Sequence, residues 1–143
     1  MSGVVFDTEA IIAYLYREPG HHAVADRLAG VFDGETDGWL TETNASEVFY
    51  FVARFEADSE TPTTASLRAA DRDIRTLSQK GIEIEQADWR HVAEVKADSD
   101  LSLADAYAVA LAHDRGATLI AGETVANASL PVDISVRPFS EHD

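Results

Sequence analysis

The sequence contains no cysteine among its 143 residues. This absence excludes disulfide bonds, thiolate ligands for metals, cysteine nucleophiles and iron–sulfur clusters. The sequence also has no run of roughly 18 apolar residues, the length that a membrane span requires. Met1 is not followed by the basic and then apolar segments of a secretory leader. We therefore expect a cytoplasmic protein that does not insert into membranes.

Positive charge is scarce in this chain. Lys80 and Lys96 are the only lysines, and 11 Lys and Arg residues face 26 Asp and Glu residues, which gives a net charge of −15 at pH 7. Repulsion at this charge is relieved in a salt-rich solution, since salt near 1 M shortens the Debye length to roughly 3 Å. We interpret the composition as a halophilic adaptation, with an ordinary acidic protein as the alternative. Low salt would disfavour a nucleic-acid partner for such a chain, and high salt weakens that objection.

The chain alternates between strand and helix patterns from end to end. Short apolar runs and period-two alternation predict strands over residues 4–6, 39–40, 82–85, 117–121 and 134–136. Apolar residues at helical spacing predict helices over residues 8–17, 21–32, 44–56, 63–79, 87–97 and 103–113. Strands separated by helices form parallel sheets with right-handed crossovers. The sequence therefore predicts one three-layer α/β/α domain with a central parallel sheet, spanning residues 1–143.

Two acidic residues interrupt apolar helical stretches. Asp105 is the single charge in residues 101–112, and Glu47 is the single charge in residues 44–53. The helix that carries Glu47 has an expected buried stripe made of Val48, Phe51, Val52 and Phe55. A carboxylate beside an apolar face is costly unless it is paired or binds a metal. Glu47 and Asp105 are therefore candidate functional residues.

Two further acids follow predicted strands. Asp7 ends the first strand, and Glu123 follows the strand over residues 117–121. In an open parallel sheet the functional crevice lies outside the carboxyl ends of the strands, and helices that start there can direct Glu47 and Asp105 into it. Four carboxylates without a thiolate suit Mg²⁺ or Mn²⁺, which bridge to phosphate. The pattern therefore predicts metal-assisted phosphodiester hydrolysis, with all four acids as catalytic residues and metal ligands.

Each acid also has a purely structural alternative. The stretches over residues 102–105 and 44–47 resemble capping boxes, in which the acid satisfies amides at a helix N-terminus. Asp7 could cap the helix that starts at Thr8, and an acid in a loop, such as Glu123, needs no special explanation. The ordered set of four acids, each next to an apolar run, favours the metal-binding interpretation over these alternatives.

Three stretches of the sequence carry a family resemblance. They are Val4-Val5-Phe6-Asp7-Thr8, Thr43-Asn44-Ala45-Ser46-Glu47-Val48 and Leu101-Ser102-Leu103-Ala104-Asp105-Ala106. These stretches resemble the PIN-domain family, and within it the small toxins of VapBC-type toxin–antitoxin pairs. Their order, their separations and the chain length are similar to that family from end to end.

The resemblance implies a three-layer domain, clustered acids that hold Mg²⁺ or Mn²⁺, and cleavage of RNA. Asp7, Glu47 and Asp105 fall on the family's first three acidic positions. The fourth position departs, because the family usually has Thr-X-Asp after the late strand and this sequence has Ala121-Gly122-Glu123. Glu123 could still reach a metal, but the hydroxyl group is missing at position 121. Thr8 matches the small hydroxyl residue that commonly follows the first acid.

The resemblance also implies partners. These are an RNA substrate, a small antitoxin protein that covers apolar surface near the acids, and a second copy of the chain in a homodimer. Arg17, Arg54 and Arg115 are candidates for phosphate contacts.

Other functions were weighed against this interpretation. A PIN-like domain that binds RNA or protein without cleaving is the alternative, because the fourth acidic position departs from the pattern. A phosphatase-like or nucleotide-binding domain would need Asp-X-Asp after the first strand or a Gly-rich phosphate loop, and the sequence has neither. The five histidines form no ligand spacing along the chain, so zinc catalysis is not expected.

Overall fold

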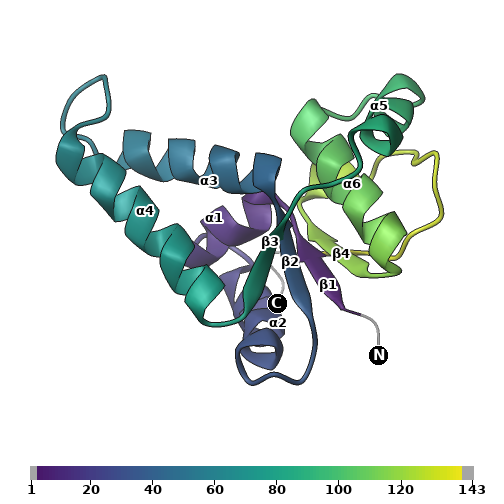
Figure 1. The fold of residues 1–143 in the computed structure, drawn as a ribbon, viewed down its shortest axis with the longest axis horizontal. Helices are drawn as coiled ribbons and strands as arrows, with labels where there is room; N and C mark the ends of the chain where they lie inside the picture. The colour runs from purple at the N-terminus through teal and green to yellow at the C-terminus, as the bar shows by residue number, and fades with distance from the viewer. Residues whose placement is uncertain (1–2, 140–143) are drawn as a thin grey trace.

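A five-stranded parallel sheet forms the centre of the molecule in a computed structural model that describes residues 3–139 (Figure 1). The strands are β1 (Val4–Phe6), β2 (Gly38–Thr41), β3 (Ile82–Glu85), β4 (Thr118–Ala121) and β5 (Val136–Pro138). Their order across the sheet is β3-β2-β1-β4-β5, and every neighbouring pair is parallel. The chain builds outward from β1 to β2 and β3, then returns to the other side of β1 for β4 and β5. The order therefore reverses between β1 and β4, which is where open parallel sheets bind ligands.

Seven helices among the described residues cover the two faces of the sheet. They are α1 (Thr8–Tyr16), α2 (His21–Phe32), α3 (Glu42–Phe55), α4 (Thr64–Gln79), α5 (Trp89–Ala97), α6 (Leu103–Arg115) and α7 (Glu123–Ala126). Figure 1 shows α5 and α6 on one face and α1 to α4 on the other, with α3 and α4 forming a hairpin that extends away from the sheet. This arrangement confirms the expected three-layer α/β/α fold.

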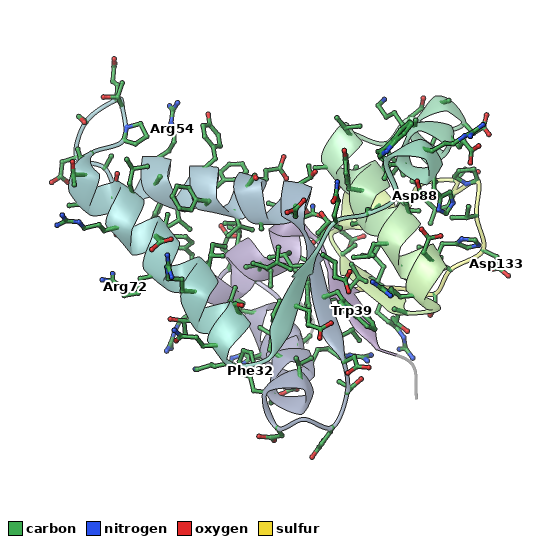
Figure 2. The ribbon with its side chains drawn as sticks, in the orientation of Figure 1. Phe32, Trp39, Arg54, Arg72, Asp88 and Asp133 are labelled. Atoms are coloured by element: carbon green, nitrogen blue, oxygen red, sulfur yellow. The ribbon has the colours of Figure 1, made fainter. Side chains whose placement is uncertain are left out.

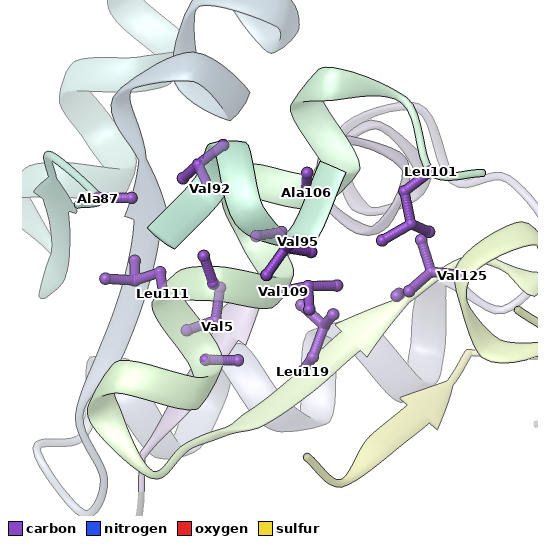
Figure 3. Close-up of a cluster of buried hydrophobic side chains, with 14 of the residues drawn as sticks. Val5, Ala87, Val92, Val95, Leu101, Ala106, Val109, Leu111, Leu119 and Val125 are labelled. Carbon is purple, nitrogen blue, oxygen red and sulfur yellow. The ribbon is translucent and has the colours of Figure 1, made fainter. Parts of the chain in front are cut away.

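The alternation of side chains along the strands divides the core in two. Val5 of β1 and Leu119 of β4 are buried on the face that α5 and α6 cover (Figure 3). Val4, Phe6 and Ile120 point to the opposite face and pack against the helices there. Because successive strand residues face opposite sides, a strand covered on both faces is apolar throughout. That is why residues 4–6 form a continuous apolar run.

One expected buried stripe was only half correct. Val48 and Val52 of α3 are buried, but Phe51 is 50% and Phe55 71% exposed. Helix α4 covers the side of α3 that carries the valines, and the hairpin projects beyond the sheet. Within residues 3–139, only the ring of Tyr16 stacks against Phe55, with the two ring centroids 4.5 Å apart. An apolar face of α3 is therefore exposed.

Two details at the end of the chain also differ from the sequence prediction. The last strand runs over Val136–Pro138 rather than residues 134–136, and a short helix, α7, directly follows β4. Four residues make too short a segment for helical periodicity to be visible in the sequence. Along residues 3–139, no helix is both long enough and apolar enough to cross a membrane.

Candidate functional site

Asp7 lies at the point where the strand order reverses. It follows β1 directly, and its side chain is almost completely buried, with 1% of its surface exposed. One carboxylate oxygen accepts a hydrogen bond of 2.7 Å from the backbone N–H of Ala10 and so caps α1. The other oxygen accepts a hydrogen bond of 3.0 Å from the backbone N–H of Gly122, just after β4. Asp7 is therefore a helix cap and also the link between the ends of the two central strands.

Burial raises the pKa of Asp7 to about 7. The two backbone hydrogen bonds oppose this change, and the nearby charges of Glu9 and Asp105 add to it. Within the described residues, no cation is among the groups that shift this pKa. A cation bound beside this buried carboxyl group would lower its pKa and favour the charged form.

A buried amide, that of Asn44, holds together the helices that carry the other acids. Its side-chain N–H₂ group donates to Thr8 Oγ1 at 3.0 Å and to the carbonyl oxygen of Ala104 at 3.4 Å. Its side-chain oxygen accepts from Thr41 Oγ1 at 2.6 Å. The sequence suggested Asn44 as a helix cap, but Thr41 caps α3 and Asn44 lies inside its first turn. The amide therefore joins the end of β2 to the first turns of α1, α3 and α6.

Glu47 and Asp105 project from the helices that this amide joins. Glu47 lies one turn beyond Asn44 on α3, and Asp105 follows Ala104 on α6. Burial raises the pKa of Asp105, the hydrogen bond from Ser102 lowers it, and the charge of Glu47 raises it again. Ser102 caps α6 by accepting a hydrogen bond from the backbone N–H of Asp105 at 3.1 Å. The Asp105 carboxylate is thus placed beside Glu47 while a serine performs the capping.

Glu123 has different surroundings. It begins α7 next to Gly122, but its side chain is exposed and one of its oxygens accepts a hydrogen bond of 3.2 Å from Asn127. In the described chain, its charge is not among the causes that shift the pKa of Asp7 or Asp105. The charge of Asp105 acts on Asp7, and the charge of Glu47 acts on Asp105, so the three acids lie in one region of the structure. Among the described residues, no three of the acids have ligand atoms within 4.8 Å of one another. The role of Glu123 as fourth acid stays a prediction.

Glu9 joins the acids although the sequence analysis did not single it out. Its carboxylate lies against Gly122, and a Cβ atom added at that glycine would collide with it. Burial raises the pKa of Glu9, and the charges of Asp105, Glu18 and Glu47 raise it further. An acid in the first turn of a helix is common because it interacts favourably with the helix dipole. The spacing Asp7-Thr8-Glu9 was therefore a weak signal in an acidic chain.

A cleft of about 310 Å³ opens beside this group. It is lined by Thr8, Glu9, Ile12, Glu18, Phe51 and Phe139. Acidic and apolar side chains therefore border the same hollow, so a ligand there would meet both carboxylates and aromatic rings.

The three arginines proposed for phosphate contacts lie elsewhere. Arg115 donates to Glu85 at 2.6 Å and lies over the ring of Trp39, at the opposite end of α6 from Asp105. Arg54 lies near the tip of the α3–α4 hairpin, where it donates to Tyr50 Oη at 3.4 Å (Figure 2). Arg17 lines a separate hollow with His21 and His22. In the described chain, none of the contacts given for these three arginines is with Asp7, Glu47 or Asp105.

The residues gathered at this edge of the sheet fit a hard divalent cation. Asp7, Glu9, Glu47 and Asp105 offer only carboxylate oxygens, which are the donors that Mg²⁺ and Mn²⁺ prefer. Burial first, and then the charges of neighbouring acids, raise the pKa values of Asp7, Glu9 and Asp105, as expected for acids grouped in one region.

Comparison with known proteins identifies the family to which this fold belongs. Residues 4–125 match the PIN domain family. The chain belongs to the PIN domain family. No curated protein matches the sequence.

Three solved structures share the fold. A chain of the VapBC2 complex from Rickettsia felis, bound to a DNA fragment from its promoter, has a TM-score of 0.68 at 10% identity and covers 94% of this chain and 97% of its own. A chain of FitAB bound to the IR36 DNA fragment has a TM-score of 0.62 at 17% identity and covers 95% and 94%. VapC20 from Mycobacterium tuberculosis, described as a sarcin–ricin loop cleaving toxin, has a TM-score of 0.58 at 14% identity and covers 82% and 87%. The shared fold thus spans 82–95% of this chain.

We predict that, in the protein free of divalent cations, the free energy of unfolding falls as the pH rises from about 4 to about 7, because of Asp7. Its pKa is higher in the folded chain than its ordinary value of 3.8, so in this window the unfolded chain binds fewer protons and rising pH favours unfolding. The contribution of protonated Asp7 to stability is fully present below its ordinary pKa of 3.8 and is lost as the pH rises through its pKa in the folded chain, about 7. One such group gives a slope of at most about 1.4 kcal/mol per pH unit.

Urea unfolding in high KCl with a chelator measures this slope. Asp7→Asn should flatten it, because the amide still caps α1 through its oxygen but does not titrate. Glu9 and Asp105, whose pKa values are raised in the same direction, leave a smaller residual slope. Asp26→Asn, at an exposed position on α2, should leave the slope unchanged. An equal slope in the parent and in Asp7→Asn would contradict the prediction.

Proposed function

We propose that the chain is a metal-dependent endoribonuclease, the toxin of a type II toxin–antitoxin pair. The observation that carries this proposal is the placement of Asp7, Glu47 and Asp105, from three separate segments, near the reversal of strand order in a PIN domain, where the charge of Asp105 acts on Asp7 and the charge of Glu47 acts on Asp105. The name of VapC20 as a sarcin–ricin loop cleaving toxin supports cleavage of nucleic acid by this fold. RNA is the substrate that the family resemblance implies.

The residues of the chain divide the work in this proposal. Asp7, Glu47 and Asp105 would hold a Mg²⁺ or Mn²⁺ ion, which would supply polarisation of the scissile phosphate and a lowered pKa for the attacking water. The amides of Ala10 and Gly122 keep the Asp7 carboxylate in place. Asn44 fixes the helices that carry Glu47 and Asp105 relative to Thr8. The site is then organised before any ligand arrives, which limits the reorganisation that catalysis would otherwise require.

We propose Glu9 as a further acid of this site, in competition with Glu123 for the fourth position. Glu9 lies against Gly122, whose N–H group binds Asp7, and its pKa responds to the charges of Asp105 and Glu47. Glu123 is exposed and bonded to Asn127. These surroundings favour Glu9 as the acid that reaches a cation held by the other three.

The proposed partners are an antitoxin and a second copy of the chain. Two of the neighbours are chains of complexes, VapBC2 and FitAB, that were solved with DNA. The exposed apolar face of α3, made of Tyr50, Phe51 and Phe55, reaches the cleft beside the acids through Phe51. An antitoxin segment that fills this cleft would cover Phe51 and the carboxylates that line it, so a bound antitoxin should suppress cleavage.

We predict that the chain cleaves structured RNA in high KCl with Mg²⁺ or Mn²⁺, and that Asp105→Asn lowers the rate by at least about a hundredfold. The change removes one charged ligand, and losses of this order are typical when a group that stabilises the transition state is removed. The cap of α6 is preserved, because Ser102 accepts from the backbone of residue 105. Gel analysis of RNA over time measures the rate, and a chelator should abolish it.

The matched control is Asp26→Asn, which makes the same chemical change at an exposed position and should cut like the parent. If the folded parent, free of any partner, fails to cut RNA, the nuclease proposal is wrong and RNA or protein binding takes its place. Equal cutting by the parent and Asp105→Asn would reject the acidic cluster as the active site.

We predict that Glu9→Gln weakens Mn²⁺ binding by about tenfold, while Glu123→Gln changes the affinity by less than about twofold, because Glu9 is the proposed fourth acid. Each variant tests one of the two candidates. Both substitutions remove one negative charge from neighbouring segments, so they control for the general field of the protein. Electron paramagnetic resonance of free Mn²⁺ measures the affinity without reference to cleavage. The reverse ranking would assign the fourth position to Glu123.

We predict that the protein is a dimer in high salt and that Phe55→Ser shifts it toward the monomer. Phe55 is 71% exposed on an apolar face, and such faces mark interaction surfaces. Sedimentation equilibrium measures the association. Trp89→Ser, which removes a 70% exposed aromatic from α5, should leave the dimer intact. A parent that stays monomeric would rule the homodimer out.

A further inference from the structure

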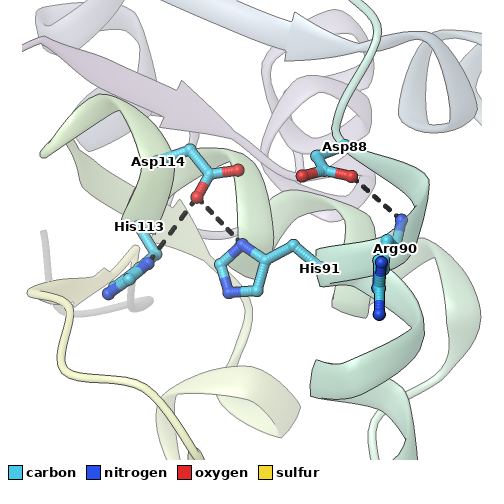
Figure 4. Close-up of polar contacts among 5 residues, drawn as sticks. All are labelled: Asp88, Arg90, His91, His113 and Asp114. Atoms are coloured by element: carbon cyan, nitrogen blue, oxygen red, sulfur yellow. Dashed lines mark hydrogen bonds and ion pairs between the residues drawn. The ribbon is translucent and has the colours of Figure 1, made fainter.

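A second group of possible metal ligands lies away from the acidic cluster. His91 of α5 and His113 and Asp114 of α6 place one ligand atom each within 4.8 Å of one another. Figure 4 shows both imidazole rings directed at the same carboxylate of Asp114. Nδ1 of His91 is 2.9 Å and Nδ1 of His113 is 3.7 Å from Asp114 Oδ1. In the described part of the chain this is the one such group of three.

The separations between the ligand atoms of this group are close to those found between the ligand atoms of a bound Zn²⁺ ion. Two donor atoms bound at about 2.0–2.1 Å to one tetrahedral Zn²⁺ lie about 3.3 Å from each other. The observed nitrogen–oxygen distances of 2.9 and 3.7 Å lie on either side of that value. His113 and Asp114 are well exposed, with 44% and 39% of their side-chain surfaces accessible, so small rotations of their side chains are possible. A metal could therefore enter between the three groups without movement of the backbone.

The packing of two helices holds this group in place. His91 precedes Val92, and both Val92 and Val95 are buried against Val109 of α6 in one apolar core (Figure 3). The two histidine rings contact each other edge to face, with their centroids 5.1 Å apart. The ligands are thus supplied by a rigid helix pair, which reduces the entropy that binding would cost.

The chemistry of the donors differs from that of the acidic cluster. Imidazole nitrogen suits Zn²⁺, Ni²⁺ and Cu²⁺, whereas Mg²⁺ requires oxygen donors and near-octahedral geometry. Asp105 and His113 lie near opposite ends of α6, about 12 Å apart along the helix at about 1.5 Å per residue. The two groups are therefore separate sites with different preferences.

We propose that His91, His113 and Asp114 form a binding site for a transition-metal dication of the Zn²⁺ class, which clamps the start of α5 to the end of α6. Three protein ligands leave a fourth position for water in a tetrahedral ion. Such an ion would stabilise the fold, because it binds ligands that only the folded chain brings together. The site does not depend on the proposed nuclease activity, so its test is independent of that proposal.

The test is calorimetric titration of the full chain with Zn²⁺ in high KCl and excess Mg²⁺, which competes for sites made of carboxylate oxygens alone and not for imidazole nitrogens. We expect one Zn²⁺ per chain with micromolar affinity. The double variant His91→Gln/His113→Gln should bind at least about a hundredfold more weakly, and Asp114→Asn at least about tenfold. Zn²⁺ should raise the Tm of the parent and not that of the double variant.

The matched control is His21→Gln/His22→Gln. These histidines also form a ring pair, with centroids 4.0 Å apart, but they belong to no group of three ligands in the described chain. This variant should bind Zn²⁺ like the parent. Equal loss in the control would show that surface histidines bind without a built site. If Asp114→Asn, which alters an exposed side chain, folds like the parent and binds Zn²⁺ equally well, or if the parent binds no Zn²⁺, the three residues are only a hydrogen-bonded cluster and the proposal is overturned.

Discussion

The buried amide of Asn44 is the interaction on which the arrangement of the acids depends. It contacts Thr41, Thr8 and Ala104, and so joins the end of one strand to the first turns of three helices. A buried amide must have its hydrogen bonds satisfied, at a cost of about 1–3 kcal/mol for each group left unpaired. This requirement admits few relative positions of the three helices. Glu47 and Asp105 are each within one turn of a residue in the network, so their separation follows from it.

The same edge of the sheet gathers charges that repel one another. Asp7 is buried where α1 and the residue after β4 supply backbone amides, and the charges of Glu9 and Asp105 act on it. The charge of Glu47 acts in turn on Glu9 and Asp105. Natural proteins tolerate such a cost at functional sites and recover stability elsewhere, here in two apolar cores on either face of the sheet. With a net charge of −15, the chain has little positive charge with which to relieve the repulsion. A divalent cation is the simplest neutralising partner.

Local sequence patterns predicted most of the fold and part of the site. The alternation of apolar runs was sufficient for the three layers and the parallel sheet, because the inner strands β1, β2 and β4 are buried on both faces. The edge strands β3 and β5 are only partly buried. The prediction of burial was wrong at Phe51 and Phe55. The spacing of apolar residues along one helix does not show whether that helix extends beyond its sheet. Asp105 could be found because its stretch is otherwise apolar. Glu9 could not, because its significance comes from Gly122, which is distant in sequence and near in space.

The histidine group, at the other end of α6, is likewise formed by packing between residues that are distant in the sequence. His91 and His113 have no informative spacing along the chain. They meet because α5 packs against α6 through buried valines. One helix thereby carries a carboxylate near its start and an imidazole near its end. Oxygen and nitrogen donors select different cations, so the two ends need not compete for the same ion. The separation of the two donor chemistries is a property of the helix packing, and it would survive the loss of either site.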